Sequence, residues 1–204
     1  ALLSRLNVEA IDIGCIADNP ENIASVFTTA IEQADVVISS GGVSVGDADY
    51  TKDVLETLGK INFWKVAMKP GKPFAFGALQ KQHATSAKGW FFGLPGNPVS
   101  AVVTYHQLVL PALRHLAGEI FDDAPALRVS TQSNLKKQPG RTDYQRGQLS
   151  LENGESHVIT TGSQSSGVLS SVAQANCYIV LEQERGAVTA GEKVNVVLFD
   201  KFLT

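Results

Sequence analysis

Helical and strand-like periods alternate along the first 119 residues. Ile23, Phe27 and Ile31 recur at a helical spacing after Asn19-Pro20, a pair that typically caps and starts a helix. Further helices are predicted at 52–58 and 98–117. Short apolar runs predict strands at 10–17, 35–39, 61–68, 73–79 and 89–93. This alternation predicts an α/β domain over residues 1–119, with three layers and a mostly parallel sheet.

The pattern changes near residue 120, where the polar segment FDDAPA ends the long helical periods. Short apolar segments follow at 127–135, 144–151, 157–161, 176–181 and 193–199. Asn153-Gly154 separates two of these segments and is a strong hairpin signal. We therefore predict a small all-β, barrel-like domain over residues 120–204.

The composition is that of a globular protein, with 44% hydrophobic and 18% charged residues, which excludes a disordered tail or a coiled coil. A net charge of -3 argues against nucleic-acid binding. No apolar run approaches the roughly 18 residues that cross a bilayer. Cys15 and Cys177 lie in apolar runs and are interpreted as buried thiols of a reducing, cytoplasmic compartment.

The start of the sequence leads us to expect that the chain is a fragment of a longer protein. Met68 is the only methionine, and the sequence opens on the end of an amphipathic helix. A sheet of this kind normally opens on a strand. We therefore expect the first strand of the α/β domain to be missing.

A glycine-rich loop follows the predicted strand 35–39. Its glycines and serines would let successive N–H groups and hydroxyls face one anion, although a tight strand-to-helix turn explains the same residues. Asp47 and Asp49 in this loop, with Asp18, would suit Mg²⁺ beside a phosphate; capping and solvated surface are the alternative.

Two further segments of the α/β domain carry candidate chemistry. Lys65, Lys69 and Lys72 cluster around KPGKP and would suit an oxyanion, although most lysine clusters are solvated surface. Asn97-Pro98 in LPGNP reads as a capped helix start, and such a start can also hold a phosphate.

The β domain offers weaker candidates in Gly140-Arg141, Arg146-Gly147 and the run 160–166, for which hairpin polarity is the stronger explanation. His106 and His115 lack a matching set of metal ligands and are interpreted as core or surface residues.

At this level of detail the sequence resembles the molybdopterin molybdenumtransferase family, MoeA, whose eukaryotic relatives include gephyrin. The stretches that carry the resemblance are the ADNP turn, DVVISSGGVSVGDADYTKDVLETLG, FWKVAMKPGKPFAFG, FFGLPGNPVSAVVTYHQLVLPAL, LKKQPGRTDYQRG and NCYIVLE. The resemblance implies a molybdopterin-binding α/β domain followed by a barrel-like C-terminal domain.

The resemblance also implies a reaction, in which adenylylated molybdopterin is hydrolysed in a Mg²⁺-dependent step, AMP is released and molybdate is inserted at the dithiolene. It implies catalytic roles for Asp49, Lys65 and Lys69, and Mg²⁺ ligation by Asp18 and Asp49. The substrate-binding residues implied are Gly41, Gly42, Ser44, Gly46, Pro95, Gly96, Asn97 and Pro98. The implied molybdate pocket consists of Lys69, Lys72, Pro73, Arg146 and Ser166.

The family works as a homodimer, so the resemblance implies an active cleft assembled across two chains. Family members carry two further N-terminal domains and an upstream STGDEL strand and loop, which this sequence lacks. Two other functions stay open: a molybdopterin adenylyltransferase-like enzyme, and a non-catalytic, gephyrin-type scaffold that binds peptides of a partner protein.

Overall fold

The computed structural model describes residues 2–43, 50–81, 88–119 and 125–199. The chain divides into two compact units, one of Ala1–Val66 with Gly71–Gly96 and one of Ala67–Pro70 with Asn97–Thr204. Residues 97–119 therefore belong to the second compact unit. The domain boundary at residues 119–120 stays a prediction.

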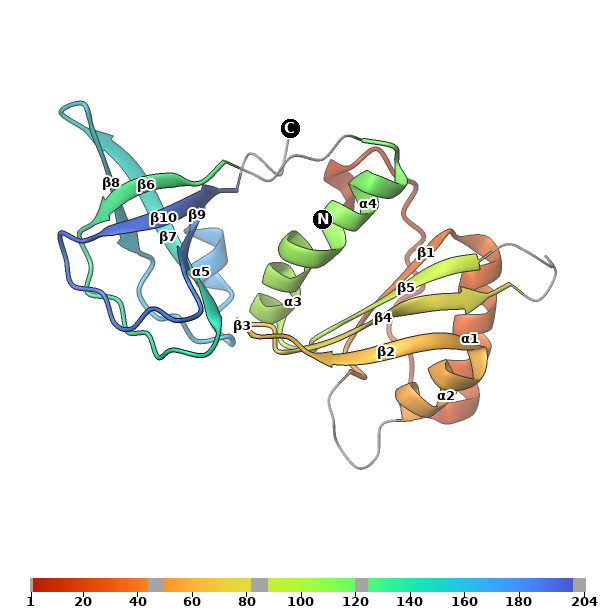
Figure 1. Ribbon diagram of the computed structural model, residues 1–204. Coiled ribbons are helices and arrows are strands. Elements are labelled where there is room, and N and C mark those ends of the chain that lie inside the picture. Colours follow the sequence, from red (N-terminus) through yellow and green to blue (C-terminus); the bar gives the residue numbers. More distant parts are fainter. Residues whose placement is uncertain (1, 44–49, 82–87, 120–124, 200–204) are drawn as a thin grey trace. The chain divides into compact units, whose positions relative to one another are not determined.

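The first unit contains a four-stranded sheet of order β1-β5-β4-β2 (Figure 1). The strands are β1 Val36–Ser40, β2 Gly59–Lys65, β4 Pro73–Gln80 and β5 Lys88–Leu94. Only β1 and β5 pair in parallel; β4 is antiparallel to both β5 and β2. The α/β class is confirmed, but the sheet is mixed rather than mostly parallel. The cause is connection length, because a parallel crossover needs about a dozen residues or more, and the links between β2, β4 and β5 are shorter.

Two helices, α1 Pro20–Gln33 and α2 Tyr50–Leu58, pack on this sheet. Asn19 caps α1 as predicted, since its Oδ1 accepts from the N–H groups of Glu21 at 2.9 Å and Asn22 at 3.3 Å. The apolar side of α1 forms one core with α2 and the sheet, and Phe27 meets Phe91 edge-on at 5.4 Å. The predicted third layer requires the long helix that begins at Pro98, and this helix belongs to the second unit.

The predicted strand at residues 10–17 is wrong. This segment has no regular secondary structure and is exposed throughout, with Ile11 at 51% and Ile13 at 45% exposure. Upstream of it, the described residues 2–9 contain a short 3₁₀ helix, η1 Leu3–Arg5, and no strand. Alternating apolar residues favour a strand only where a neighbouring strand takes up their backbone hydrogen bonds, and none of the described strands pairs with this segment.

The predicted helix at 98–117 is confirmed with an internal change of winding. It runs as α3 Pro98–Thr104, a π-helical turn η2 Tyr105–Val109, and α4 Leu110–Leu116. The Leu110 N–H donates to the Tyr105 carbonyl, five residues back. Pro111 has no N–H to continue the regular ladder, which accounts for a wider turn just before it. Gly118, with a φ of 81°, ends the helix as predicted.

The rest of the second unit is a closed barrel of five strands (Figure 1). Its strands are β6 Leu127–Thr131, β7 Thr142–Glu152, β8 Glu155–Thr160, β9 Cys177–Leu181 and β10 Lys193–Leu198. All five were predicted, and Asn153 and Gly154 turn the β7–β8 hairpin with φ values of 52° and 83°. A two-residue strand, β3 Met68–Lys69, joins β7 in parallel, and a helical turn, α5 Ser170–Ala173, precedes β9.

The two cysteines differ, which corrects the expectation that both are buried. Cys15 is exposed, whereas Cys177 lies in the barrel core, where burial raises the pKa of its thiol to about 12. Within the described residues, no helix is both long enough and apolar enough to cross a membrane.

Candidate functional site

Two loops meet at the carboxyl ends of the parallel strands β1 and β5. The Gly41 N–H donates to the Leu94 carbonyl at 3.0 Å, and Ser40 Oγ donates to the Pro95 carbonyl at 3.2 Å. A Cβ on Gly96 would lie 3.6 Å from Gly41 Cα, so the two backbones are almost in contact. This edge is where open α/β sheets bind ligands.

The loop that follows β1 requires glycine at position 42. Its φ is 68°, and a Cβ there would lie 2.5 Å from Thr51 Oγ1. The structure thus brings Gly41, Gly42, Pro95 and Gly96 together as the predicted substrate-binding set requires. The Gly41 N–H is already used within the fold, so this amide is not available to an anion.

Several predicted residues fall outside the described part of the chain: Ser44, Gly46, Asp47 and Asp49. Asp18, the other predicted Mg²⁺ ligand, is exposed just before α1. Among the described residues, no group of three His, Cys, Asp or Glu side chains could hold a metal ion. The described residues alone therefore do not make a magnesium site.

Lys65 and Lys72 lie at one end of the β2–β4 hairpin. Lys65 is the register partner of Pro73, and the Val66 N–H donates to the Lys72 carbonyl at 2.8 Å. Both lysines are exposed, and neither has an ion-pair partner within the residues that the structure describes. The first unit thus presents two positive charges to solvent beside Pro73.

Asn97 and Pro98 begin α3 in the second unit. Asn97 occupies the N-cap position, but its side chain makes no capping hydrogen bond, and its Oδ1 is buried without a partner among the described residues. The prediction that Asn97 occupies the N-cap and Pro98 starts the helix is confirmed, without a side-chain capping bond. Its backbone carbonyl still accepts the first helical hydrogen bond, from Ala101 at 2.9 Å.

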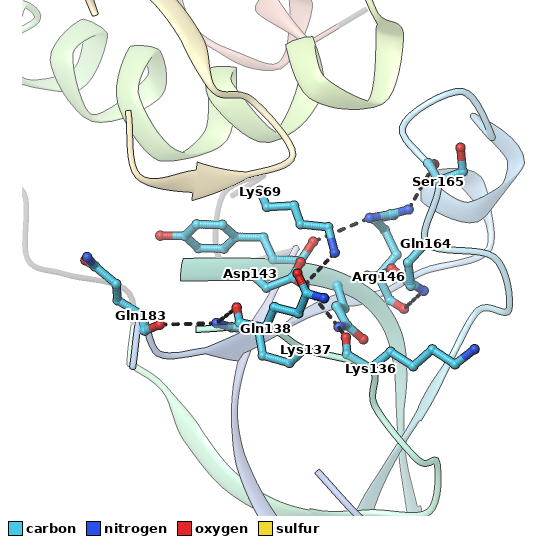
Figure 2. Close-up of polar contacts among 11 residues, drawn as sticks. Lys69, Lys136, Lys137, Gln138, Asp143, Arg146, Gln164, Ser165 and Gln183 are labelled. Atoms are coloured by element: carbon cyan, nitrogen blue, oxygen red, sulfur yellow. Dashed lines mark hydrogen bonds and ion pairs between the residues drawn. The ribbon is translucent and has the colours of Figure 1, made fainter. Parts of the chain in front are cut away.

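Lys69 is held by an acidic residue that the sequence analysis did not single out. Its Nζ lies 3.2 Å from Asp143 Oδ2, across the β3–β7 pairing that places the two residues in register (Figure 2). The Asp143 side chain is only 3% exposed, against 46% for Lys69. Gln145 Nε2 also donates to Asp143 Oδ2, at 3.2 Å. Asp143 is thus a buried carboxylate with a cation and an amide as partners.

Arg146 is fully buried in the barrel. Its guanidinium donates to Ser171 Oγ at 3.1 Å and to the Ser165 carbonyl at 3.2 Å. Gln164 brackets its backbone, accepting from the Arg146 N–H and donating to the carbonyl. Burial lowers the pKa of Arg146, while Tyr178 and Asp143 act electrostatically in the opposite direction. Ser166, its predicted companion, is half-buried in the same loop.

A cavity of about 260 Å³ lies beside Lys69 in the second unit. Its lining carries four cations and one carboxylate, from Lys69, Lys136, Lys137, Gln138, Pro139, Arg141 and Asp143. Sequence reasoning singled out Gly140-Arg141 but missed Lys136, Lys137 and Asp143. The signal in the sequence that could have found them is the high density of positive charges in LKKQPGR. This segment is a polar turn, yet its Lys137 is buried.

Both halves of the chain match known family models. Residues 1–115 match a model described as "Probable molybdopterin binding domain". The chain belongs to this family. Residues 128–199 match the MoeA C-terminal region (domain IV), so the resemblance read from the sequence motifs is confirmed in both halves.

Curated relatives agree with the family models. A molybdopterin molybdenumtransferase of Haemophilus influenzae is 49% identical over 99% of this chain, which covers 49% of that relative. A gephyrin of Dictyostelium discoideum is 34% identical over 96% of this chain, which covers 29% of it. The chain thus spans about half the length of the first relative and less of the second.

Solved structures support the fold. A molybdopterin biosynthesis MoeA protein from Pyrococcus horikosii matches 97% of this chain with a TM-score of 0.74 and 27% identity, and the match covers 46% of that protein. A molybdenum cofactor biosynthesis protein from Pyrococcus furiosus matches with a TM-score of 0.71 and 26% identity, over 97% of this chain and 61% of that one.

Proposed function

We propose that this protein acts in molybdenum cofactor biosynthesis as a molybdopterin molybdenumtransferase. It takes adenylylated molybdopterin, releases AMP by hydrolysis, and inserts molybdate at the dithiolene. The observation that carries this proposal is that the chain matches both a molybdopterin-binding family and the MoeA C-terminal region, in that order. The 49% identity to a molybdopterin molybdenumtransferase over nearly the whole chain points to the same reaction.

The first unit would bind the pterin and its phosphates. Gly41, Gly42, Pro95 and Gly96 come together at the ends of β1 and β5, and backbone rather than bulky side chains lines this edge. Ser44, Gly46 and Asp49 would complete the site as the family pattern implies. Lys65, an exposed ammonium group, would neutralise substrate charge, and Lys69 of the second unit has the same proposed role.

The second unit would contribute the molybdate side of the reaction. The family pattern implies that Lys69, Arg146 and Ser166, together with Lys72 and Pro73, would bind the molybdate. Asn97 and Pro98 would belong to the pterin pocket wall. Fixed positive charges stabilise a dianion without having to reorganise when it arrives, and this is how the chain's own residues would favour the transfer.

The proposed reaction uses Mg²⁺, which would neutralise phosphate charge of the substrate. The described residues do not by themselves form a magnesium site, since Asp18 is exposed. Asp49, the other ligand proposed, lies outside the described residues. The proposal also includes a homodimer and a cytoplasmic location.

A chimera tests the proposed reaction. This chain replaces the matching half of the Haemophilus influenzae relative, and AMP release from adenylylated molybdopterin is followed by chromatography with molybdate and Mg²⁺ present. We expect the chimera to release AMP and the Lys65→Gln chimera to lose most of that activity. A folded chimera without AMP release, beside an active unmodified relative, would refute the proposal.

A further inference from the structure

Arg146 and Tyr178 face each other across two neighbouring strands of the barrel. They are register partners in the antiparallel β7–β9 pairing, so their side chains lie side by side on one face of the two strands. Cys177 and Ile179, which flank Tyr178 in β9, belong to the apolar core of the barrel. Tyr178 and Arg146 therefore point to the opposite face. Both are nevertheless 0% exposed, so other elements of the protein cover them.

The Tyr178 hydroxyl reaches a histidine of the long helix. It lies 2.9 Å from His106 Nδ1, and the two rings meet edge-on with centroids 5.8 Å apart. Burial raises the pKa of Tyr178, so the hydroxyl stays protonated near neutral pH and can donate to Nδ1. His106 is buried and lies in the π-helical turn η2, so this contact connects the turn to β9.

Neighbouring rings hold the Tyr178 ring as well. Phe199 packs on it with ring centroids 4.5 Å apart, and Tyr144 meets it edge-on at 6.1 Å. A tyrosine has only two side-chain torsions, so these rings together with a hydrogen bond at the hydroxyl fix its position. Tyr178 is therefore a rigid wall beside the Arg146 side chain.

Arg146 uses three of its donors within the fold. Its guanidinium donates to Ser171 Oγ at 3.1 Å, to the Ser165 carbonyl at 3.2 Å (Figure 2) and to the Tyr144 carbonyl at 3.5 Å. A guanidinium has five N–H donors, so about two are left over from these contacts with described residues. Arg146 is thus both anchored and able to donate to a ligand. Tyr178 also interacts with it electrostatically, which raises the pKa of Arg146 against the effect of burial.

We propose that Tyr178 and His106 are positioning residues, which hold the Arg146 guanidinium so that its remaining N–H groups can meet molybdate. The hydrogen bond to His106 fixes the tyrosine ring, and the ring blocks other positions of the arginine side chain. Ordering a long arginine side chain costs conformational entropy, and a fixed wall lowers that cost before the anion arrives. The inference rests on the proposed function, in which Arg146 binds molybdate.

Tyr105 offers a matched control for Tyr178. It precedes His106 in the helix and is 5% exposed, and its hydroxyl has no hydrogen-bond partner among the described residues. Removing this hydroxyl deletes the same atom from a buried tyrosine but leaves the His106–Tyr178 contact intact. Tyr105→Phe and Tyr178→Phe therefore differ in the feature that the proposal concerns.

Calorimetric titration of the whole 204-residue chain with molybdate tests the proposal. We expect Tyr178→Phe to weaken binding about fivefold to tenfold, because the ring loses its anchor, and Tyr105→Phe to leave binding within twofold. His106→Leu should act like Tyr178→Phe. His106→Asn should restore most of the affinity, since its amide can take the place of Nδ1 and bond the hydroxyl. A merely structural role would not predict this rescue.

A double variant shows whether Tyr178 acts through Arg146. In an Arg146→Lys chain, which lacks the guanidinium, adding Tyr178→Phe should change molybdate binding by less than twofold. Multiplying effects of the two changes would contradict the proposal, as would equal affinities of Tyr178→Phe and Tyr105→Phe. Thermal melting identifies variants that fail to fold, and the two Tyr→Phe variants keep the test usable if His106→Leu does not fold.

Turnover separates this inference from the proposed function. In the chimera, Tyr178→Phe should raise the KM for molybdate with little change in kcat, since it affects how the anion is held. Molybdate binding that depends on Tyr178, without AMP release by the unmodified chimera, would refute only the proposed reaction. AMP release with the same KM in Tyr178→Phe, or no molybdate binding by the unchanged chain, would overturn the positioning role.

Discussion

Several cations of the two units differ sharply in their environments. Lys65 and Lys72 stand exposed at the end of a hairpin in the first unit. In the second unit Lys137 and Arg146 are buried with hydrogen-bond partners, and Lys69 is paired with the buried Asp143. Lys69 and Lys72 are only three residues apart in KPGK, so local sequence does not decide which environment a lysine has.

Exposed and buried cations differ in how they could bind an oxyanion. An exposed lysine has no other structural task and can move to meet a substrate, but it is fully solvated and contributes little to stability. A buried cation is fixed in place and needs partners, so removing it also damages the fold. The two groups should therefore separate in experiments that measure stability and activity on the same variants.

The largest effect is expected for Arg146→Ala. The change leaves Asp143 with less compensation and the Ser171 and Ser165 groups without their donor. We expect a loss of about 3–5 kcal/mol in the free energy of unfolding. Urea denaturation, followed by a spectroscopic signal from the barrel, measures this loss. Arg128→Ala, exposed on β6, should change it by less than about 0.5 kcal/mol. Similar values for both variants would show that Arg146 is not structural.

The glycine loop of the first unit should be sensitive for a steric reason rather than an electrostatic one. Gly42→Ala places a Cβ 2.5 Å from Thr51 Oγ1 at a φ of 68°, which should cost about 1–3 kcal/mol of stability. Gly96→Ala is the matched control in the same unit, because its nearest contact would be an ordinary 3.6 Å. Thermal melting of both variants checks this, and equal melting temperatures would count against the loop geometry.

A smaller effect is expected for Lys69→Met, since the ammonium is half exposed. Loss of its ion pair with Asp143 should cost about 1 kcal/mol or less at low salt. The cost should shrink further as salt is raised, because exposed charges are screened. Urea midpoints at two salt concentrations measure it; a cost of several kcal/mol at both would mean that Lys69 is as structural as Arg146.

The smallest effect on stability is expected for Lys65→Gln and Lys72→Gln, at less than about 0.5 kcal/mol each. Lys65 is proposed to neutralise substrate charge and Lys72 to bind molybdate, so AMP release by the chimera in the presence of molybdate should fall at least tenfold in each. Unfolding and turnover measured on the same preparations check this. A variant with unchanged turnover would remove that lysine from the proposed site.

Local signals predicted the parts of the fold whose cause is local. Asn19-Pro20 specifies the start of α1 through its own hydrogen bonds, and Asn153-Gly154 specifies the β7–β8 turn through backbone conformation. The segment 10–17 was predicted wrongly because its pattern says nothing of whether a neighbouring strand exists. Strand direction in the first sheet differs from the prediction because the links between β2, β4 and β5 are too short for parallel crossovers.

Some residues of the candidate site could be predicted from the sequence and others could not, for a similar reason. Gly41, Gly42, Pro95 and Gly96 follow strands, and strand ends of an α/β sheet are a general place for ligands. The roles of Lys137 and Asp143 depend instead on burial and on the β3–β7 register, which join residues 74 positions apart. The spacing of residues along the sequence does not reveal such long-range contacts. For Arg146, the residue type suggested an anion ligand, but its complete burial and its hydrogen bonds to Ser171 and Ser165 could not be predicted from the sequence.

The reaction proposed for this chain requires that it binds molybdate, and the most direct measurement of that binding is crystallographic. Crystals of the chain are soaked in molybdate, and the anomalous signal of molybdenum is mapped at its absorption edge. We expect a peak beside Lys69, Arg146 and Ser166, which is lost in crystals of Lys69→Met. A well-measured map with molybdenum peaks only elsewhere, or with the same peak in the variant, would contradict this expectation.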